Sequence, residues 1–250
     1  MLRDIAERLL PEIYVARLSA IDHYVRGEPE IRLLRRLCHD KGTVADVGAN
    51  IGTYTYFMSR YAKRCIAYEP NPLLAARLSR LFPQVIVRNV ALSNRPQTLE
   101  LLVPVSKGRP AHELGSISQS FEGTQELQRH VVHSVTLDSE EIHDLGFLKI
   151  DVEQHEKEVL EGGLRTIERC RPIIMSETTP LLYETGLLER FHFMTELGYR
   201  GWATFLNRLL AFDELDSDIH LNPNLFGKSF INPNVFFFPN EIDPRVLLEK

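Results

Sequence analysis

The chain has 250 residues, 44% of them hydrophobic, which is enough for one large domain with a sizeable buried core. Its formal net charge is −5, and lysine and arginine are spread along the sequence instead of forming the basic stripe of a nucleic-acid-binding protein. We therefore expect no nucleic-acid partner. The cysteines Cys38, Cys65 and Cys170 lie far apart without the paired spacing of a zinc site, which indicates reduced thiols in a cytoplasmic protein.

Residues 1–40 predict an N-terminal helical cap, with a break near Pro11 and a second helix over residues 28–38. We expect these helices to pack on a sheet or to cover a cofactor pocket, and a membrane or partner contact is the less favoured use. The charged beginning of the chain is unlike a signal peptide, and no segment approaches the ~20 apolar residues that span a bilayer. Residues 41–250 are expected to form the main domain.

A glycine-containing turn follows the first predicted strand. The short apolar run of residues 44–47 predicts a buried parallel strand. The turn lies between Gly48 and Gly52, where missing Cβ atoms let a ligand approach the backbone, and a helix begins directly after it. Asp46 and Asn50 add polar groups to the turn. The stretch therefore predicts a binding site for a small molecule with a carboxylate or phosphate group.

The second predicted strand, residues 65–68, ends in Glu69. A carboxylate about 20 residues past such a turn is where a doubly wound fold places the acceptor for ribose hydroxyls. The turn lacks the second glycine of the dinucleotide pattern, so S-adenosylmethionine is favoured over NAD as the ligand. The alternative is that the glycines and Glu69 only mark an ordinary βαβ unit.

The next segment contains a third strand, an additional strand and a long loop. Residues 84–92 predict the third strand, and Asn89 near its end either binds the adenine ring or caps a turn. Residues 98–103 predict a short additional strand, and residues 131–138 predict another. Residues 104–130 between them are polar and long, as expected of a functional or disordered loop.

A second group of polar residues follows the apolar run that starts at residue 147. Residues 147–153 predict a strand whose alternation places Asp151 and Glu153 on one side, near its carboxyl end. If this strand neighbours the first, both carboxylates lie beside the glycine turn. His155 comes next, and a helix is predicted over residues 156–168.

The last third of the chain predicts further strands and a helix of the same α/β sheet. Strands are expected over residues 172–177, 199–205 and 234–239, and a helix over residues 187–197. Residues 207–233 are interpreted as a lid on the acceptor side, with an ordinary connection as the alternative.

These motifs together resemble the FkbM-type S-adenosylmethionine-dependent methyltransferases, over about residues 43–240. The motifs that carry the resemblance are residues 46–54, 68–72, 89–92, 136–138, 148–153 and 171–177, together with Glu156. The resemblance implies a class I methyltransferase Rossmann-like fold, with a mostly parallel seven-stranded sheet and helices on both faces. It also implies S-adenosylmethionine as cofactor and a hydroxyl acceptor on a sugar, glycan or polyketide-like small molecule.

By the same resemblance, Asp46, Gly48, Asn50 and Gly52 are expected at the methionine end of the cofactor, and Glu69 at its ribose.

Two further positions bear on the resemblance. Ser116 is similar to a small-Ser-apolar element of the family's long loop and is expected to close over the cofactor. Gln154 stands where the family usually has glycine. If that glycine serves close approach to the ligand, Gln154 narrows the pocket or signals a different acceptor.

Methyl transfer to an alcohol is helped by a base, and Asp151, Glu153 and His155 are the candidate catalytic residues. His155 titrates nearest to neutral pH. The alternative roles are that Asp151 orients the methionine amino group, Glu153 supports the turn, and His155 only begins the helix. A divalent metal between Asp151 and Glu177 would also activate a hydroxyl, but no ligand spacing demands one, so we expect no metal.

Two other functions remain open from the sequence. One is a non-catalytic nucleotide-binding or scaffold module that has kept the sheet. The other is an NAD-dependent oxidoreductase, which the glycine spacing disfavours.

Overall fold

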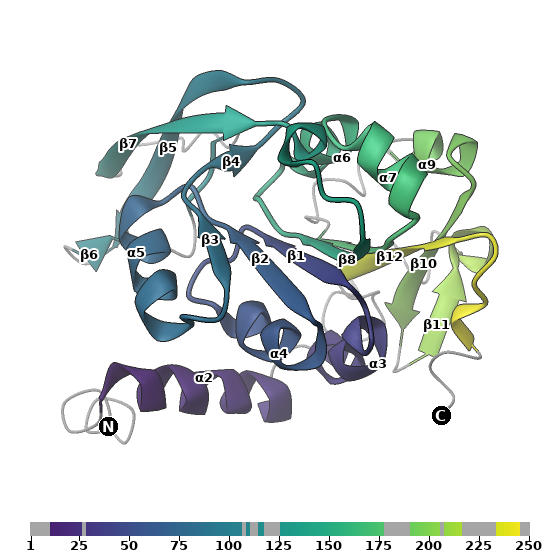
Figure 1. The fold of residues 1–250 in the computed structure, drawn as a ribbon, viewed down its shortest axis with the longest axis horizontal. Helices are drawn as coiled ribbons and strands as arrows, with labels where there is room; N and C mark the ends of the chain where they lie inside the picture. The colour runs from purple at the N-terminus through teal and green to yellow at the C-terminus, as the bar shows by residue number, and fades with distance from the viewer. Residues whose placement is uncertain are drawn as a thin grey trace.

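The computed structural model describes residues 11–26, 29–106, 109–110, 115–117, 126–177, 191–205, 208–216 and 234–245. Within these residues the chain forms an eight-stranded sheet in the order β11-β10-β12-β9-β8-β1-β2-β3 (Figure 1). Its strands are β1 (Thr43–Val47), β2 (Arg64–Tyr68), β3 (Ile86–Arg88), β8 (Leu145–Ile150), β9 (Ile173–Glu177), β10 (Tyr199–Phe205), β11 (Arg208–Ala211) and β12 (Asn234–Pro239).

The five strands from β3 to β9 are parallel, and β12, β10 and β11 continue the sheet with antiparallel pairs. The predicted α/β sheet, mostly parallel, is confirmed, but it has eight described strands where seven were expected. The additional strand is β11, which pairs with β10 and lies inside the segment predicted to be a lid. An ordinary sheet connection therefore accounts for the start of that segment, while residues 217–233 lie outside the described residues.

Strand β1 is buried on both of its faces. All five of its residues are buried. Val44 belongs to the core cluster that contains Met58 of α4, whereas Ala45 and Val47 belong to the cluster that contains Val159 of α6. Alternating side chains of one strand thus enter two different cores, as expected of a parallel sheet between two helical layers.

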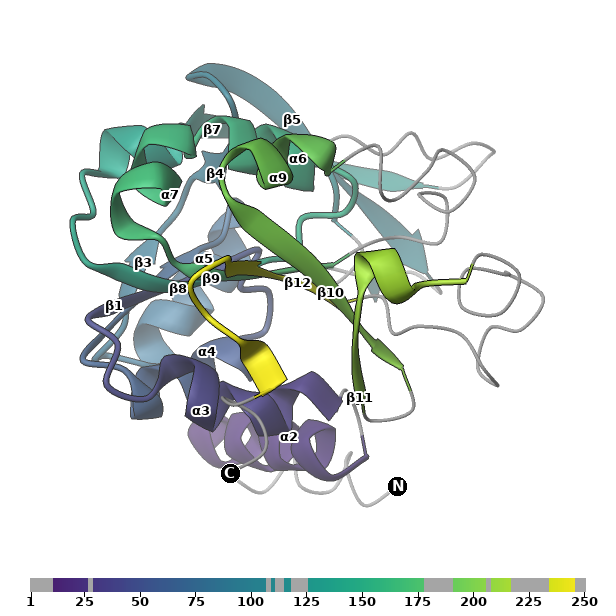
Figure 2. The same ribbon diagram turned by 90° about the vertical axis from the view of Figure 1, so that its right-hand side faces the viewer.

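Helices cover both faces of the sheet (Figure 2). On the face of the first core lie α3, α4 and α5, and on the opposite face lie α6, α7 and α9. The helical segments described are α2 (Glu12–Arg26), η1 (Pro29–Leu33), α3 (Leu34–Cys38), α4 (Thr53–Tyr61), α5 (Pro72–Leu81), η3 (Leu137–Glu140), α6 (Glu156–Glu161), α7 (Leu164–Cys170), α9 (His192–Glu196) and η5 (Phe212–Glu214).

A second, smaller sheet lies beyond the ends of the first strands, in the order β4-β7-β5-β6. Its strands are β4 (Ala91–Leu92), β5 (Gln97–Ser106), β6 (Arg109–Pro110) and β7 (Leu127–Val135). The hairpin of β5 and β7 is longer than predicted, since both strands extend into the segment expected to be a loop.

The predicted third strand, residues 84–92, is wrong as a single strand. It divides at Asn89 into β3, which pairs with β2, and β4, which pairs with β7 of the smaller sheet. The Asn89 side chain donates hydrogen bonds to the carbonyl oxygens of Glu69 (2.8 Å) and Pro70 (3.0 Å). These bonds hold the chain at the point where it leaves the main sheet.

The N-terminal helix α2 packs on α4 and α5, outside the main layers. The rings of Tyr24 and Phe57 lie 5.6 Å apart between centroids, and Glu12 pairs with Arg77 at 2.8 Å. Over the described residues the expected helices are present as α2 and as η1 with α3, whereas residues 1–10 lie outside the described residues. Helix α2 packs on other helices, and α3 contacts the sheet. In the part of the chain that is described, no helix is long and apolar enough to cross a membrane.

Candidate active site

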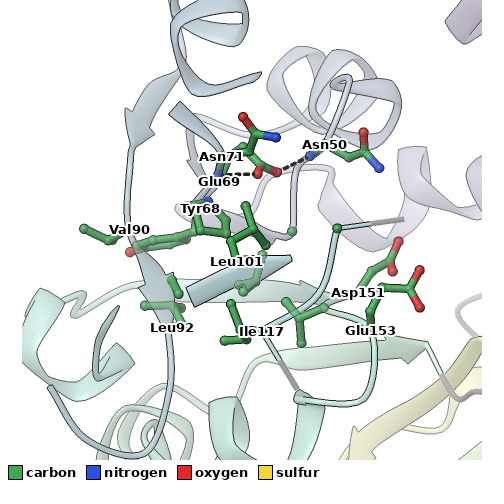
Figure 3. Close-up of a pocket in the computed structure, with 16 residues that line it drawn as sticks. Asn50, Tyr68, Glu69, Asn71, Val90, Leu92, Leu101, Ile117, Asp151 and Glu153 are labelled. Carbon is green, nitrogen blue, oxygen red and sulfur yellow. Dashed lines mark hydrogen bonds between the residues drawn. The ribbon is translucent and has the colours of Figure 1, made fainter. Parts of the chain in front are cut away.

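A pocket opens at the carboxyl ends of β1, β2 and β8, below the smaller sheet (Figure 3). This edge is where open α/β sheets bind their ligands. The described residues that line it come from the three strand ends, the start of β4, β5 and the segment 115–117. They are Val47, Gly48, Asn50, Tyr68, Glu69, Pro70, Asn71, Val90, Ala91, Leu92, Leu101, Gly115, Ile117, Asp151, Val152 and Glu153.

The glycine turn forms one wall of this pocket. Gly48, Asn50 and Gly52 have positive φ angles of 76°, 51° and 90°. A Cβ atom on Gly48 would lie 1.8 Å from the carbonyl oxygen of Asp151, so only glycine allows the turn to pack against the end of β8. Gly52 serves packing as well, because its Cβ would lie 2.6 Å from Leu78 of α5, and it does not line the pocket.

Glu69 joins the glycine turn to the start of α5. Its buried carboxylate accepts hydrogen bonds from the backbone N–H groups of Asn50 (2.7 Å) and Asn71 (2.8 Å), as Figure 3 shows. Burial raises the pKa of Glu69 to about 7, although the two N–H donors favour the ionised form. The carboxylate therefore faces the pocket in a titratable state near neutral pH.

Asp46 lies beneath the pocket instead of lining it. Its buried carboxylate accepts a hydrogen bond from the Thr55 hydroxyl at 2.5 Å and lies 3.5 Å from Nζ of Lys149. Asp46 thus fixes the start of α4 and balances a buried cation. Its place at the methionine end of the cofactor stays a prediction.

Lys149 is a functional residue that the sequence reasoning missed. Its Nζ lies 3.0 Å from Oδ2 of Asp151 and 4.7 Å from the ring centroid of Tyr54. Burial opposes the charge, but Asp151 and Asp46 outweigh it and raise the pKa of Lys149 above its usual range. The available signal was a lone lysine within the apolar run of β8, because a buried lysine needs acidic partners.

Three carboxylates meet where β8 and β9 end. Oxygen atoms of Asp151, Glu153 and Glu177 all lie within 4.8 Å of one another, and Figure 3 shows the first two side chains pointing the same way. Burial and the hydrogen bond with Asp151 raise the pKa of Glu177 to about 10. Burial alone would raise the pKa of Asp151, but Lys149 and the bond with Glu177 lower it. Glu177 therefore holds a proton toward an ionised Asp151.

Glu153 is the third carboxylate of this group of Asp151, Glu153 and Glu177, which we call the acidic corner. Burial and the neighbouring charge of Asp151 raise its pKa above the usual range of a glutamate. Glu153 lines the pocket and is half-buried. A carboxylate with a raised pKa at a pocket wall is a stronger base than an ordinary glutamate. The three oxygens are also close enough to share one cation, as hard cations prefer.

The backbone conformation after β8 gives a structural reason for a glycine at the position of Gln154. Glu153 and Gln154 have successive positive φ angles of 53° and 76°, which side-chain-bearing residues rarely adopt. The Glu156 carboxylate accepts a hydrogen bond from the N–H of Gln154 at 3.1 Å and supports this conformation. Gln154 does not line the pocket, so the left-handed backbone is the structural demand at this position.

His155 also lies away from the pocket wall. Its Nε2 atom is 3.0 Å from the Ser93 hydroxyl, and its Nδ1 atom is 3.6 Å from a Glu158 oxygen. Burial lowers the pKa of His155. The ring lies between Ser93, which follows β4, and the start of α6. This position fits the alternative that His155 only begins the helix. Its role as a base stays a prediction.

Ser116 fastens the segment 115–117 over the pocket. Its hydroxyl donates to the carbonyl oxygen of Glu153 at 2.9 Å, and its backbone pairs with Leu102 of β5. Its neighbours Gly115 and Ile117 line the pocket, whereas Ser116 itself does not. Ser116 therefore ties the segment to the backbone at Glu153, and its closure over the cofactor stays a prediction.

The side of the pocket toward the smaller sheet is apolar. Val90, Leu92, Leu101 and Ile117 line this side (Figure 3). The sequence placed residues 89–92 beside Glu69 and predicted an adenine site there. Within this stretch the Asn89 side chain bonds the turn after β2, which fits its alternative role, and Val90 and Leu92 line the pocket. The adenine site stays a prediction. Leu101 and Ile117 come from segments read only as a strand and a loop.

The mostly parallel sheet with antiparallel strands at one end and helices on both faces is the fold of class I methyltransferases. Residues 46–201 match the sequence model of the family described as Methyltransferase FkbM domain. The chain is 30% identical over 176 residues to the hexuronic acid methyltransferase AglP of Haloferax volcanii, across 65% of this chain and 71% of that protein. The chain belongs to the FkbM methyltransferase family, as its motifs predicted.

A solved structure supports the fold. The methyltransferase FkbM from Methylobacillus flagellatus KT matches with a TM-score of 0.50 at 16% sequence identity. The match covers 94% of this chain and 57% of that one, so this chain spans little more than half of that protein.

Proposed function

We propose that this chain transfers a methyl group from S-adenosylmethionine to a hydroxyl oxygen of a sugar, either within a glycan or in a small molecule. The observation that carries the proposal is a single pocket with two different ends. Glu69 and the glycine turn form one end, and the carboxylates of Asp151 and Glu153 form the other. The name of the Haloferax relative, a hexuronic acid methyltransferase, supports a sugar acceptor.

The residues present fit the cofactor. Gly48 lets the turn pack against the backbone of Asp151, which a Cβ atom would prevent, and both residues line the pocket. Glu69 offers a buried carboxylate to ribose hydroxyls, and Leu92 and Ile117 belong to the apolar wall for an adenine ring. Asp151, ionised beside a buried lysine, suits the ammonium group of the methionine part.

The bound cofactor supplies a methyl group on a positively charged sulfur, which is open to attack by an oxygen nucleophile. Glu153 accepts the proton of the attacking hydroxyl, because its raised pKa makes it a stronger base than an ordinary glutamate. Glu177 keeps its proton and so limits the negative charge of the corner. The apolar wall and the segment held by Ser116 exclude water and keep the reacting groups in place.

The acidic corner also favours one of the two acceptors that a hexuronic acid offers. A sugar hydroxyl is neutral and needs a base, whereas a sugar carboxylate needs no base and is repelled by Asp151 and Glu153. We therefore propose methylation of a hydroxyl, which forms a methyl ether.

The test uses methyl-labelled S-adenosylmethionine with oligosaccharides that contain hexuronic acid and, as a second set, neutral sugars. Label should enter a product that resists mild alkali, since an ether survives this treatment and an ester does not. Release of labelled methanol by alkali would contradict the hydroxyl acceptor. Cofactor binding without transfer to any acceptor would favour the non-catalytic module instead.

A further inference from the structure

The outward face of α2 carries an apolar stripe that the proposed function does not use. We define the α2 stripe as Tyr14, Leu18, Ile21 and Val25. Their spacing places all four on one side of the helix. Their exposed fractions are 51%, 51%, 47% and 58%, whereas Ala16 and Ala20 are buried among the core residues that include α4.

The stripe is a concentration and not a scatter of single residues. Among the described residues nine large apolar side chains are exposed, and five of them belong to α2, namely the stripe and Tyr24. The other four are spread over α5, β3, β7 and α7. Isolated exposed apolar residues are normal, but a contiguous group marks a contact surface.

Basic side chains gather beside the stripe. A hollow of about 390 Å³ next to α2 is lined by Arg17, Arg60 and Arg80, together with Ile13 and Tyr56. The Arg60 guanidinium lies 3.7 Å from the ring centroid of Tyr56. In a protein with a net charge of −5, three arginines at one hollow create a local site for anions.

The acidic residues of α2 cancel this group only in part. Glu12 pairs with Arg77 of α5 as well as with Arg80 of the hollow, so these residues together keep a net positive charge. Asp22 is exposed on α2 five positions after Arg17, on the opposite edge of the stripe from the hollow. The apolar stripe is therefore bordered on the α5 side by positive charge.

We propose that this face of the protein rests on an anionic phospholipid membrane. The α2 stripe enters the boundary between headgroups and acyl chains, and Arg17, Arg60 and Arg80 bind lipid phosphates. Tyr14 and Tyr24 suit this boundary because their rings are apolar and their hydroxyls are polar. The arginine hollow favours a membrane over a second copy of the chain. A second copy is also negatively charged, but only the lipid surface presents a dense layer of phosphates.

The test is sedimentation of the full chain with vesicles of phosphatidylcholine alone and with vesicles that contain about one third phosphatidylglycerol. The chain should sediment with the anionic vesicles, and less at high salt. Leu18→Glu should lower the partition coefficient by about tenfold or more, since it removes apolar contact and adds a repelled charge. The matched control is Val131→Glu, at a side chain of β7 that is 71% exposed, which should sediment like the wild type.

A second pair of variants tests the charge contribution separately. Arg17→Glu should lower binding to anionic vesicles by about tenfold, whereas Arg129→Glu on β7 should change it much less. Circular dichroism and cofactor calorimetry verify that each variant is folded. The proposal is overturned if the wild type stays in the supernatant with both vesicles, or if Leu18→Glu sediments like the wild type. A dimer that Leu18→Glu converts to a monomer would assign the face to self-association instead.

Discussion

The two ends of the pocket achieve their shape by different physical means. At the end formed by β1 and β2, backbone geometry dominates, since Gly48 has a positive φ and Glu69 bridges two N–H groups. At the end formed by β8 and β9, coupled charges dominate. The positive charge of Lys149 and the proton of Glu177 both stabilise the negative charge of Asp151. Mutations at the first end should therefore act through sterics, and mutations at the second through electrostatics.

The largest effect is expected from Lys149→Met. The change leaves the buried carboxylate of Asp46 and the half-buried carboxylate of Asp151 without their cation, which should lower the free energy of unfolding by about 3–5 kcal/mol. Urea denaturation measures this loss. The matched control is Arg165→Met, whose exposed ion pair with Asp138 should contribute about 1 kcal/mol or less. Equal effects of the two substitutions would refute the role of the buried charge network.

Gly48→Ala should have the next largest effect on stability. Its Cβ would meet the Asp151 carbonyl oxygen at 1.8 Å, so the turn must move, at a cost of about 3 kcal/mol. Gly198→Ala is the matched control, because Gly198 has a similar φ of 74° but its Cβ would meet only the flexible Arg171 side chain at 3.3 Å. The control should cost about 1 kcal/mol in urea denaturation. A Gly48→Ala variant as stable as the control would show that the close approach is unimportant.

Glu153→Gln should separate chemistry from binding. Loss of the base should reduce kcat by about 100-fold, while the Kd for S-adenosylmethionine changes little. Steady-state kinetics and calorimetry give the two quantities. His155→Ala should reduce turnover less, because its ring contacts Ser93 and Glu158 instead of the pocket. A larger loss of kcat for His155→Ala than for Glu153→Gln would make His155 the base.

The smallest expected effect is a pH dependence of cofactor affinity. Glu69 has a raised pKa of about 7, so its folded, neutral form contributes stability that is lost as the pH rises through 7. Ribose hydroxyls donate to the ionised form, so binding should release a proton below that pH. Affinity should then rise between about pH 5 and 7, by at most about tenfold per pH unit, and level off above. Calorimetric titrations of the Glu69→Gln variant should show a smaller rise of cofactor affinity with pH, because the contribution of the Glu69 carboxyl is lost.

Sequence patterns predicted the parts of the site that depend on local spacing. Gly48 and Glu69 were identified because a strand, a turn and a second strand fix their separation along the chain. Lys149 was missed because its burial beside Asp46 arises only when β1 and β8 are neighbours. Such a pairing is a tertiary contact that no short window contains.

The smaller sheet shows the same limit at the level of the fold. Residues 84–92 read as one strand because their apolar pattern is continuous, yet the chain changes sheets at Asn89. The apolar wall from Leu101 and Ile117 was equally hidden, because β5 and the segment 115–117 meet the pocket only through long-range pairing.

The central claim is that the ends of β1 and β2 hold an adenosyl cofactor while the acidic corner performs the chemistry. Calorimetric titration of S-adenosylmethionine into the wild type, Glu69→Ala and Glu153→Gln tests it most directly. The account predicts binding to the wild type, at least about tenfold weaker binding to Glu69→Ala, and wild-type affinity for Glu153→Gln. Undiminished affinity in a folded Glu69→Ala variant, or no binding to the wild type, would contradict it.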